Sequence, residues 1–315
     1  MEHIGQISAL ASAALWVVTG LAFAVAGRKV GAWVVNAVRI WLALGCLLIL
    51  HVLLYGSVVP THSADAWLWL SISGVLGLAI GDQFLYQSLV DAGPRTTTLV
   101  MATVPGITAA IAWPVLGQTI GAWGLVGMLV TLAGIIGVIA QRPGTSGRVY
   151  PMMRRGVILA FLAAICQAVG LVTAKMGMGN PDSIESVGPW SATLVRVAVA
   201  TPLVTVMLLL SRRMMREPGG AMEGNGSGTG LLLAQQGKAI WWTIILGAVC
   251  GPFLGVGTAL VAIDYVDAGV AATLMATSPV MIIPFARWIE GEQFNPRALW
   301  GAVIAVIGVG LLTMM

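Results

Sequence analysis

The chain is a succession of long apolar segments that contain almost no charge. Runs of about 17 to 25 apolar residues are long enough to cross a bilayer as helices. Ten such runs lie at about 4–26, 33–55, 67–90, 97–116, 120–140, 156–178, 187–210, 240–263, 268–288 and 298–314. Only 9% of the 315 residues are charged, against about 25% in a soluble domain. A soluble architecture is therefore excluded, and the sequence predicts an all-α membrane protein with ten transmembrane helices.

Two polar stretches interrupt the apolar pattern. Residues 141–155 form a linker that divides the chain into a first part, 1–140, and a second part, 156–315, with five segments each. Residues 212–238 are rich in glycine and too polar to bury much surface, so we expect a disordered loop there.

The two halves repeat each other. At a constant offset of 174 residues, four features of the first half recur in the second, namely Ala102-Thr103-Val104-Pro105 as Ala276-Thr277-Ser278-Pro279, Gly117-Gln118 as Gly291-Glu292, Gly127 as Gly301, and Gly134 as Gly308. Because each half holds an odd number of segments, the two copies enter the membrane in opposite senses. The sequence thus predicts two five-helix inverted-topology repeats.

Positive charge is distributed unevenly between the loops. Thirteen of the 16 Lys and Arg residues lie in the loops after the odd-numbered segments, Lys175 alone lies on the other side, and Arg39 and Arg196 lie within segments. The positive-inside rule predicts that the basic loops are cytoplasmic and that both termini are outside. The net charge of +4 then reflects orientation in the plasma (inner) membrane, and we expect no nucleic-acid partner.

The last helix of each half follows a short turn, which reads Gly291-Glu292-Gln293-Phe294 in the second half and Gly117-Gln118 in the first. With its ten segments and inverted repeat, the sequence resembles the drug/metabolite transporter superfamily, specifically the EamA-type ten-helix permeases. The resemblance covers the chain except for 212–238. It implies secondary transport of small organic molecules through a cavity between the repeats. Members of the family are usually drawn with cytoplasmic termini, so the charge count departs from the family picture.

The small four-helix multidrug proteins of the same superfamily exchange protons through a glutamate three residues before a glycine in their first helix. The similar position here is Gln167, before Gly170, and in the first half it is Val17. Neither side chain binds and releases a proton, so that antiport chemistry is disfavoured. Gln167 and the neighbouring mid-helix Trp16 remain candidates for substrate contact, with packing as the alternative for each.

One polar stripe marks the third segment. Asp82, Gln83 and Tyr86, with Gln87, lie at i, i+1, i+4 and i+5 and share a helix face. We assign the first three to substrate binding or coupling. An unpaired carboxylate in this setting is the best candidate for proton coupling, which we assign to Asp82. The alternative is an aspartate that hydrogen-bonds a neighbouring helix.

Two arginines and two prolines occupy equivalent places in the two halves. Arg39 and Arg196 lie near the start of the second helix, where they either snorkel, form a structural ion pair, or bind a substrate carboxylate. Pro105 and Pro279 kink the fourth helix, and Thr103 and Thr277 can satisfy the freed carbonyl groups. We also count Thr103 and Thr277 among the substrate-binding or coupling candidates. These kinks are either static or hinges for alternating access.

The sequence therefore predicts a secondary active transporter, an exporter or exchanger of small organic metabolites such as amino-acid-like or amphipathic compounds. No phosphate-binding loop is present, so coupling falls to protons or a counter-substrate. We expect no enzymatic activity, cofactor or metal, and a monomer or homodimer. Two alternatives are an intramembrane aspartyl protease that uses Asp82 and Asp264, and a non-transporting membrane partner protein.

Overall fold

The computed structural model describes residues 2–139, 152–179, 186–216, 238–281 and 296–313, and within these ranges it contains helices and no strands. The helices of the first half are α1 (Glu2–Val30), α2 (Ala32–Tyr55), α3 (Ala64–Ser73), η1 (Gly74–Gly81), α4 (Asp82–Asp91), α5 (Gly93–Met101), α6 (Val104–Leu116) and α7 (Ala122–Ile139). Those of the second half are α8 (Met153–Met178), α9 (Pro189–Arg216), α11 (Lys238–Ala248), η2 (Val249–Gly255), α12 (Val256–Tyr265), α13 (Ala268–Met275), α14 (Ser278–Met281) and α16 (Pro296–Thr313).

The helices are long and apolar enough for a multi-pass membrane protein. Among the described residues, seven helical stretches qualify as membrane spans: Glu2–Phe23, Trp33–Tyr55, Ala64–Leu89, Thr96–Leu116, Met153–Met178, Pro189–Ser211 and Ile240–Tyr265. Two further apolar helices, Ala122–Gly137 and Trp300–Leu311, are shorter. Large apolar side chains such as Leu53 and Trp123 are 76% and 70% exposed on the outer surface, where lipid would cover them.

Two predicted boundaries shift in the structure. The helix α9 continues to Arg216, so the first residues of the predicted loop 212–238 are helical, and residues 217–237 lie outside the described ranges. The helix α8 begins at Met153, within the predicted linker 141–155, of which residues 141–151 are also outside. Of the predicted ninth segment, 268–288, only α13 and α14 are described.

The third span of each half widens into a π-helix. The segment η1 joins α3 to α4 and carries Gly74, Gly77 and Gly81, while η2 joins α11 to α12 and carries Gly251 and Gly255. A π-helix holds one extra residue per turn, and such bulges are frequent at functional sites. At the end of η1 the backbone N–H of Asp82 donates to the Gly77 carbonyl, five residues earlier.

The fourth predicted segment of each half is broken at equivalent residues. The helix α5 ends at Met101 and α6 begins at Val104, and α13 and α14 are separated by Ala276 and Thr277. Thr103 Oγ1 donates to the Val100 carbonyl and Thr277 Oγ1 to the Leu274 carbonyl, both at 2.7 Å. The break precedes each proline because the first turn of a helix is where a missing N–H costs least.

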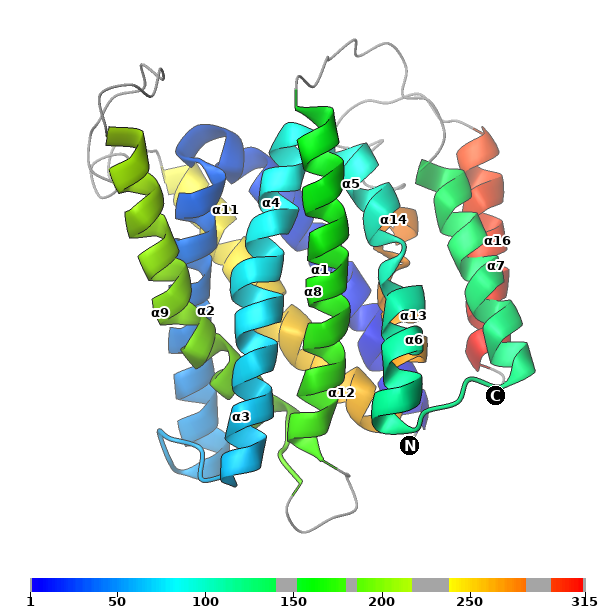
Figure 1. The fold of residues 1–315 in the computed structure, drawn as a ribbon, viewed down its shortest axis with the longest axis horizontal. Coiled ribbons are helices and arrows are strands. Elements are labelled where there is room, and N and C mark those ends of the chain that lie inside the picture. Colours follow the sequence, from blue (N-terminus) through cyan, green and yellow to red (C-terminus); the bar gives the residue numbers. More distant parts are fainter. Residues whose placement is uncertain (1, 140–151, 180–185, 217–237, 282–295, 314–315) are drawn as a thin grey trace.

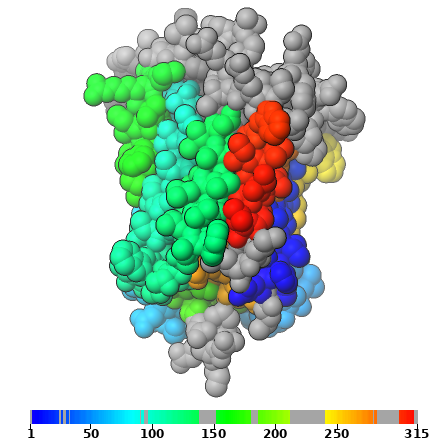
Figure 2. All heavy atoms as spheres, turned by 90° about the vertical axis from the view of Figure 1, so that its right-hand side faces the viewer, coloured from blue at the N-terminus to red at the C-terminus, as the bar shows by residue number. Residues whose placement is uncertain are grey.

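The two halves interlock. The first helix of each half packs against the π-helix of the other, so that α8 contacts η1 and α1 contacts η2. The last helices, α7 and α16, form a pair at one side of the bundle (Figure 1) and lie next to each other on one face (Figure 2). Both chain ends lie at the same end of the bundle (Figure 1).

Glycines allow the close approach of α7 and α16. A Cβ atom on Gly134 would lie 2.3 Å from the backbone nitrogen of Ala305, and one on Gly308 would lie 2.3 Å from that of Thr131. Small residues that bring helix backbones together are a common basis of packing in membranes. The repeated glycines at positions 134 and 308 are therefore explained by this contact.

Candidate functional site

A buried ion pair lies where the two halves meet. Arg39 of α2 and Asp82 of α4 are both fully buried, and Arg39 Nη2 donates a hydrogen bond to Asp82 Oδ2. The other carboxylate oxygen, Oδ1, accepts a hydrogen bond of 2.8 Å from Gln167 Nε2 of α8. The expectation that Asp82 is unpaired is therefore wrong, because both of its oxygens are engaged. Its role in coupling stays a prediction.

Arg39 is held on several sides. Its Nε donates to Asn36 Oδ1 at 3.0 Å, and Asn36 Nδ2 in turn donates to Gln83 Oε1 at 3.3 Å. The guanidinium carbon lies 4.8 Å from the ring centre of Tyr86 and 5.2 Å from that of Phe23. Cation–π contacts of this kind stabilise a desolvated cation. The guanidinium group of Arg39 is therefore fixed in position.

The π-helix brings Asp82 to Gln167. The Gly77 carbonyl accepts both the Asp82 backbone N–H and, at 3.3 Å, Gln167 Nε2. A Cβ atom on Gly81 would lie 3.0 Å from Cys166 Cβ, so only a glycine lets α8 approach this closely. The local geometry of η1 thus decides which side chains of the second half reach the aspartate.

Arg196 of α9 completes the charged cluster from the second half. It is 4% exposed, and its Nε has no hydrogen-bond partner among the described residues. A Cβ atom on Gly77 would lie 3.2 Å from Arg196 Nη2, and one on Gly74 would lie 2.3 Å from the Arg196 carbonyl oxygen. Asp82 also attracts Arg196 electrostatically. The glycines of η1 therefore make room for Arg196 beside the ion pair.

We call Arg39, Asp82 and Arg196, with their neighbours Asn36, Gln83, Tyr86 and Gln167, the central cluster. Its three ionisable groups lie deep within apolar spans, since Arg39, Asp82 and Arg196 are each six or seven residues from the nearer end of their span. At 1.5 Å per residue this depth is about 10 Å. Charged groups at such depth are costly and are usually retained for function.

The other predicted site residues lie elsewhere. Trp16 of α1 is half-buried and packs near η2, its Nε1 lying 3.5 Å from the position of a Cβ on Gly255. Thr103 is exposed and lines an open apolar groove of about 510 Å³ between α5 and α8. Thr277 and Pro105 are buried at the helix breaks, and the side chain of Pro279 lies outside the described residues.

The sequence reading missed Asn36. It precedes Arg39 by three residues, a spacing that puts both side chains on one helix face, so the pattern was visible in the sequence. The stacking of Phe23 on Arg39 could not be read in the same way, because it joins α1 to α2 through tertiary packing.

The second aspartate of the protease alternative lies in another cluster. Lys175 Nζ donates to the Asp264 backbone carbonyl at 3.0 Å, and no described hydrogen bond or ion pair joins Asp264 to Asp82. Burial raises the pKa of nearby Asp267, and the attraction of Lys175 opposes that rise. The pair of aspartates that a protease needs is therefore not formed within the described part of the chain.

Two histidines meet one serine at the end of the bundle near α3 and α9. Ser191 Oγ lies 3.2 Å from His51 Nε2 and 2.7 Å from His62 Nε2, and His51 Nδ1 lies 2.7 Å from the Ser57 carbonyl oxygen. Burial and the neighbouring His51 lower the pKa of His62 below its usual value. Within the described ranges, no three His, Cys, Asp or Glu side chains are grouped to hold a metal ion.

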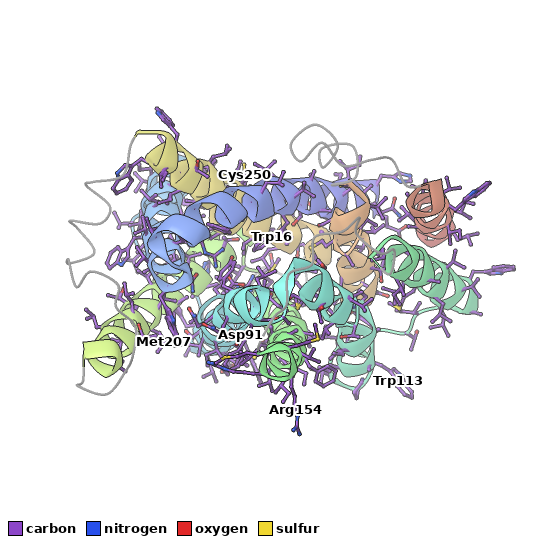
Figure 3. The ribbon with its side chains drawn as sticks, turned by 90° about the horizontal axis from the view of Figure 1, so that it is seen from above. Trp16, Asp91, Trp113, Arg154, Met207 and Cys250 are labelled. Carbon is purple, nitrogen blue, oxygen red and sulfur yellow. The ribbon has the colours of Figure 1, made fainter. Side chains whose placement is uncertain are left out.

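Figure 3 views the bundle from above and separates inward from outward side chains. Trp113, which is 67% exposed, and Arg154 point away from the helices. Asp91 lies between α4 and α8 (Figure 3), where it accepts a hydrogen bond of 2.8 Å from Gln87 and approaches Arg155 to 3.4 Å. Of the predicted polar stripe, Asp82, Gln83 and Tyr86 thus join the central cluster, whereas Gln87 binds Asp91.

Comparison with known proteins agrees with these features. The model of the EamA-like transporter family matches residues 3–140 and again residues 154–314. No curated protein matches the chain, whereas 29 chains of solved structures do. One of these, described as "Crystal structure of protein", matches 98% of this chain and 96% of its own length, with a TM-score of 0.72 and 18% sequence identity. At that identity the likeness shows the fold alone.

Proposed function

Because the chain belongs to the EamA-like transporter family, which its two matched halves establish, we propose that it is a secondary active transporter of small organic metabolites. It acts as an exporter or exchanger of amino-acid-like or amphipathic compounds. The two halves form inverted repeats of five helices each, and the substrate site lies between them.

The observation that carries this proposal is the central cluster. Its members come from both halves, with Arg39 and Asp82 from the first and Gln167 and Arg196 from the second. Ionisable residues within membrane spans are rare, and by default they are candidates for substrate or ion pathways. A site shared between two repeats is also where alternating access would expose a substrate to each side in turn.

The broken fourth helices supply a route for the conformational change. Near Thr103 and Thr277 the backbone leaves the helical hydrogen-bond pattern, and each threonine hydroxyl satisfies one freed carbonyl. Hinges are short segments at the ends of elements that absorb a change in backbone angles. We assign the hinges to these breaks, with Pro105 and Pro279 just beyond them.

Asp82 is the coupling residue in this proposal. A proton on Asp82 would remove the negative charge that Arg39 and Gln167 bind, and would weaken both hydrogen bonds. Proton binding would thereby loosen the contact between the halves. The same contact is remade when the proton leaves.

The protein resides in the plasma (inner) membrane with the basic loops in the cytoplasm and both termini outside. The charge distribution in the sequence supports this orientation. A reporter enzyme that works only in the cytoplasm, fused to the C-terminus, should be inactive. Cytoplasmic activity of the fusion would overturn the orientation and leave the transport proposal intact.

The transport function is tested with purified protein. A thermal-shift screen against amino acids, organic acids, nucleosides and cationic drugs identifies compounds that stabilise the folded state. Each compound that stabilises it is then tested for counterflow in proteoliposomes, where a preloaded substrate drives the uptake of labelled substrate. Failure of every compound in both assays would refute the proposal.

A further inference from the structure

Arg196 is a buried cation that has no carboxylate of its own among the described residues. Asp82 is the carboxylate beside it, and Asp82 already binds Arg39 through Oδ2 and Gln167 through Oδ1. Two guanidinium groups and one carboxylate give the described central cluster a formal charge of +1. One positive charge is therefore left over at membrane depth.

The repeat shows why this charge is unmatched. In the first half, the arginine of the second helix finds its carboxylate on the third helix of the same half. Arg196 is the equivalent arginine of the second half, but the position that follows Asp82 by 174 residues is Val256. The second repeat has kept the cation and holds an apolar side chain at the position of the acid.

An unmatched charge at this depth is costly. A buried charge without a partner destabilises a protein about as much as breaking a buried ion pair does. A residue that served packing alone would be better replaced by an apolar one. The free-energy cost of burying Arg196 is offset if a negatively charged group binds it during the transport cycle.

The unpaired polar groups of the central cluster are hydrogen-bond donors. Within the described ranges, Gln83 Nε2 and Arg196 Nε are buried without partners, and both can only donate hydrogen bonds. A carboxylate only accepts, and it offers about four lone-pair positions. An ammonium group would add a third cation and more donors, so the cluster disfavours purely cationic ligands.

We infer that the substrate carries a carboxylate and that Arg196 is the residue that binds it. The inference rests on the proposed transport function and specifies its substrate as an organic acid or a zwitterion. Charge-assisted hydrogen bonds from a guanidinium group to a carboxylate supply both affinity and orientation. Gly77 leaves the space in which the guanidinium group lies, and Gly74 makes room for the Arg196 backbone.

The test uses chemically matched ligands on the full-length protein. Purified protein is heated with free L-amino acids, with the corresponding amino-acid amides, with mono- and dicarboxylic acids, and with sodium chloride or phosphate. We expect stabilisation by carboxylate-bearing compounds and little by the amides. Equal stabilisation by acids and amides would overturn the inference, and so would an effect that chloride or phosphate alone reproduces.

Two variants assign the effect to Arg196. In Arg196→Gln, the apparent affinity for the stabilising acids should fall roughly ten-fold or more, as loss of a charged hydrogen bond implies. Lys175→Gln removes another partly buried cation of the second half, outside the central cluster, and should keep wild-type affinity. Unchanged affinity in Arg196→Gln would refute the assignment.

A second measurement separates binding from architecture. Without ligand, Arg196→Gln should melt at a higher temperature than the wild-type protein, because it removes an unmatched buried charge. A structural ion pair predicts the opposite, and a lower melting temperature would therefore count against the inference.

Counterflow distinguishes this inference from the transport proposal. If neutral or cationic compounds exchange and Arg196→Gln does not affect their exchange, the protein is a transporter and the carboxylate inference fails. If no compound of the panel exchanges, both fail. Exchange of acids that is lost in Arg196→Gln and kept in Lys175→Gln supports both.

Discussion

The two π-helices have similar backbones and different chemistry. Each lies in the third span of its half and packs against the first helix of the other half. Beyond η1 come Asp82, Gln83 and Tyr86, and at the same offset beyond η2 come Val256, Gly257 and Leu260. The backbone distortion has been kept in both repeats, whereas the charged side chains occur in one.

The helices that pack against the two π-helices, α8 and α1, also differ in the polar contacts that they make. Gln167 of α8 donates to the Gly77 carbonyl in η1 and to Asp82. On the other side, Ser12 of α1 donates to the Gly255 carbonyl at 2.9 Å, and Trp16 lies nearby. The η1 contact is thus charged, while the η2 contact is made of neutral groups. We infer that η1 carries the chemistry and that η2 preserves the matching shape.

The largest expected effect comes from Asp82→Asn. The substitution leaves Arg39 and Arg196 buried without a carboxylate, which should destabilise the protein by about 3–5 kcal/mol and abolish uptake driven by a pH gradient in proteoliposomes. Asp264→Asn makes the same chemical change in the third span of the second half, outside the central cluster. It should leave coupled uptake intact.

A double variant separates coupling from folding. Arg39→Gln combined with Asp82→Asn returns the formal charge of the cluster to that of the wild type, with Arg196 as the remaining cation. We expect its melting temperature to recover much of the loss while uptake stays independent of pH. Unchanged pH-dependent uptake in either Asp82 variant would exclude Asp82 as the coupling group.

Some features of the two halves could be predicted from the sequence alone, and others could not. The apolar spans, the repeat and the equivalence of Arg39 with Arg196 follow from periodicity and offset, and the resemblance to EamA-type permeases is confirmed. The π-helices η1 and η2 could not be predicted, because an apolar sequence rich in glycine is compatible with both an α-helix and a π-helix. Whether Asp82 has a partner depends on that local geometry.

Other features depend on contacts between distant residues. Thr103 was grouped with the substrate site because the repeat placed it beside Pro105, yet its side chain faces an outer groove. Rotation about a helix axis near a break is set by packing, which apolar periodicity in a uniformly apolar segment does not reveal. Two residues with equivalent places in the repeat can therefore have different surroundings, as exposed Thr103 and buried Thr277 do.

A methyl group added to each π-helix should give the next largest effect. Gly77 and Gly251 are equivalent, and a Cβ would lie 3.2 Å from Arg196 Nη2 at the first and 3.0 Å from Thr19 Cγ2 at the second. Each alanine should cost about 1 kcal/mol through overpacking. Gly77→Ala should also weaken substrate uptake because it pushes on the guanidinium group, whereas Gly251→Ala should not. Equal loss of uptake in both would mean that η2 is as close to the chemistry as η1.

The helix breaks test whether the halves move alike. Thr103→Val and Thr277→Val each remove a hydroxyl that satisfies a carbonyl at a break, a loss of about 0.6 kcal/mol in a membrane helix. If both breaks are hinges, the two variants should change the counterflow rate similarly, by up to about threefold. Thr201→Val removes the same type of bond from unbroken α9 and should leave the rate unchanged. An effect of only one variant would restrict the hinge to one half.

The smallest effect concerns the connection between the second and third spans of the first half. Here His62 contacts Ser191 of the second half directly, and Ser57 is connected to Ser191 through His51. Since the Ser57 carbonyl only accepts, His51 Nδ1 carries a hydrogen, neutral His51 Nε2 accepts from Ser191, and His62 Nε2 donates to Ser191. The chain of hydrogen bonds therefore fits two neutral histidines.

Burial and His51 lower the pKa of His62 below 6.5 in the folded protein, so the unfolded chain binds a proton first as the pH falls. The contribution to stability is thus complete above pH 6.5 and is lost as the pH falls through the lowered pKa. Because His62 is only partly buried, the melting temperature should fall by only about 1 °C from this source. His62→Gln keeps an amide donor for Ser191 but does not titrate, so its melting temperature should depend less on pH than that of the exposed control His3→Gln. Equal pH dependence in the two variants would show that the serine contact tolerates a charged His62, and that the two halves are joined at this end by contacts that do not depend on pH.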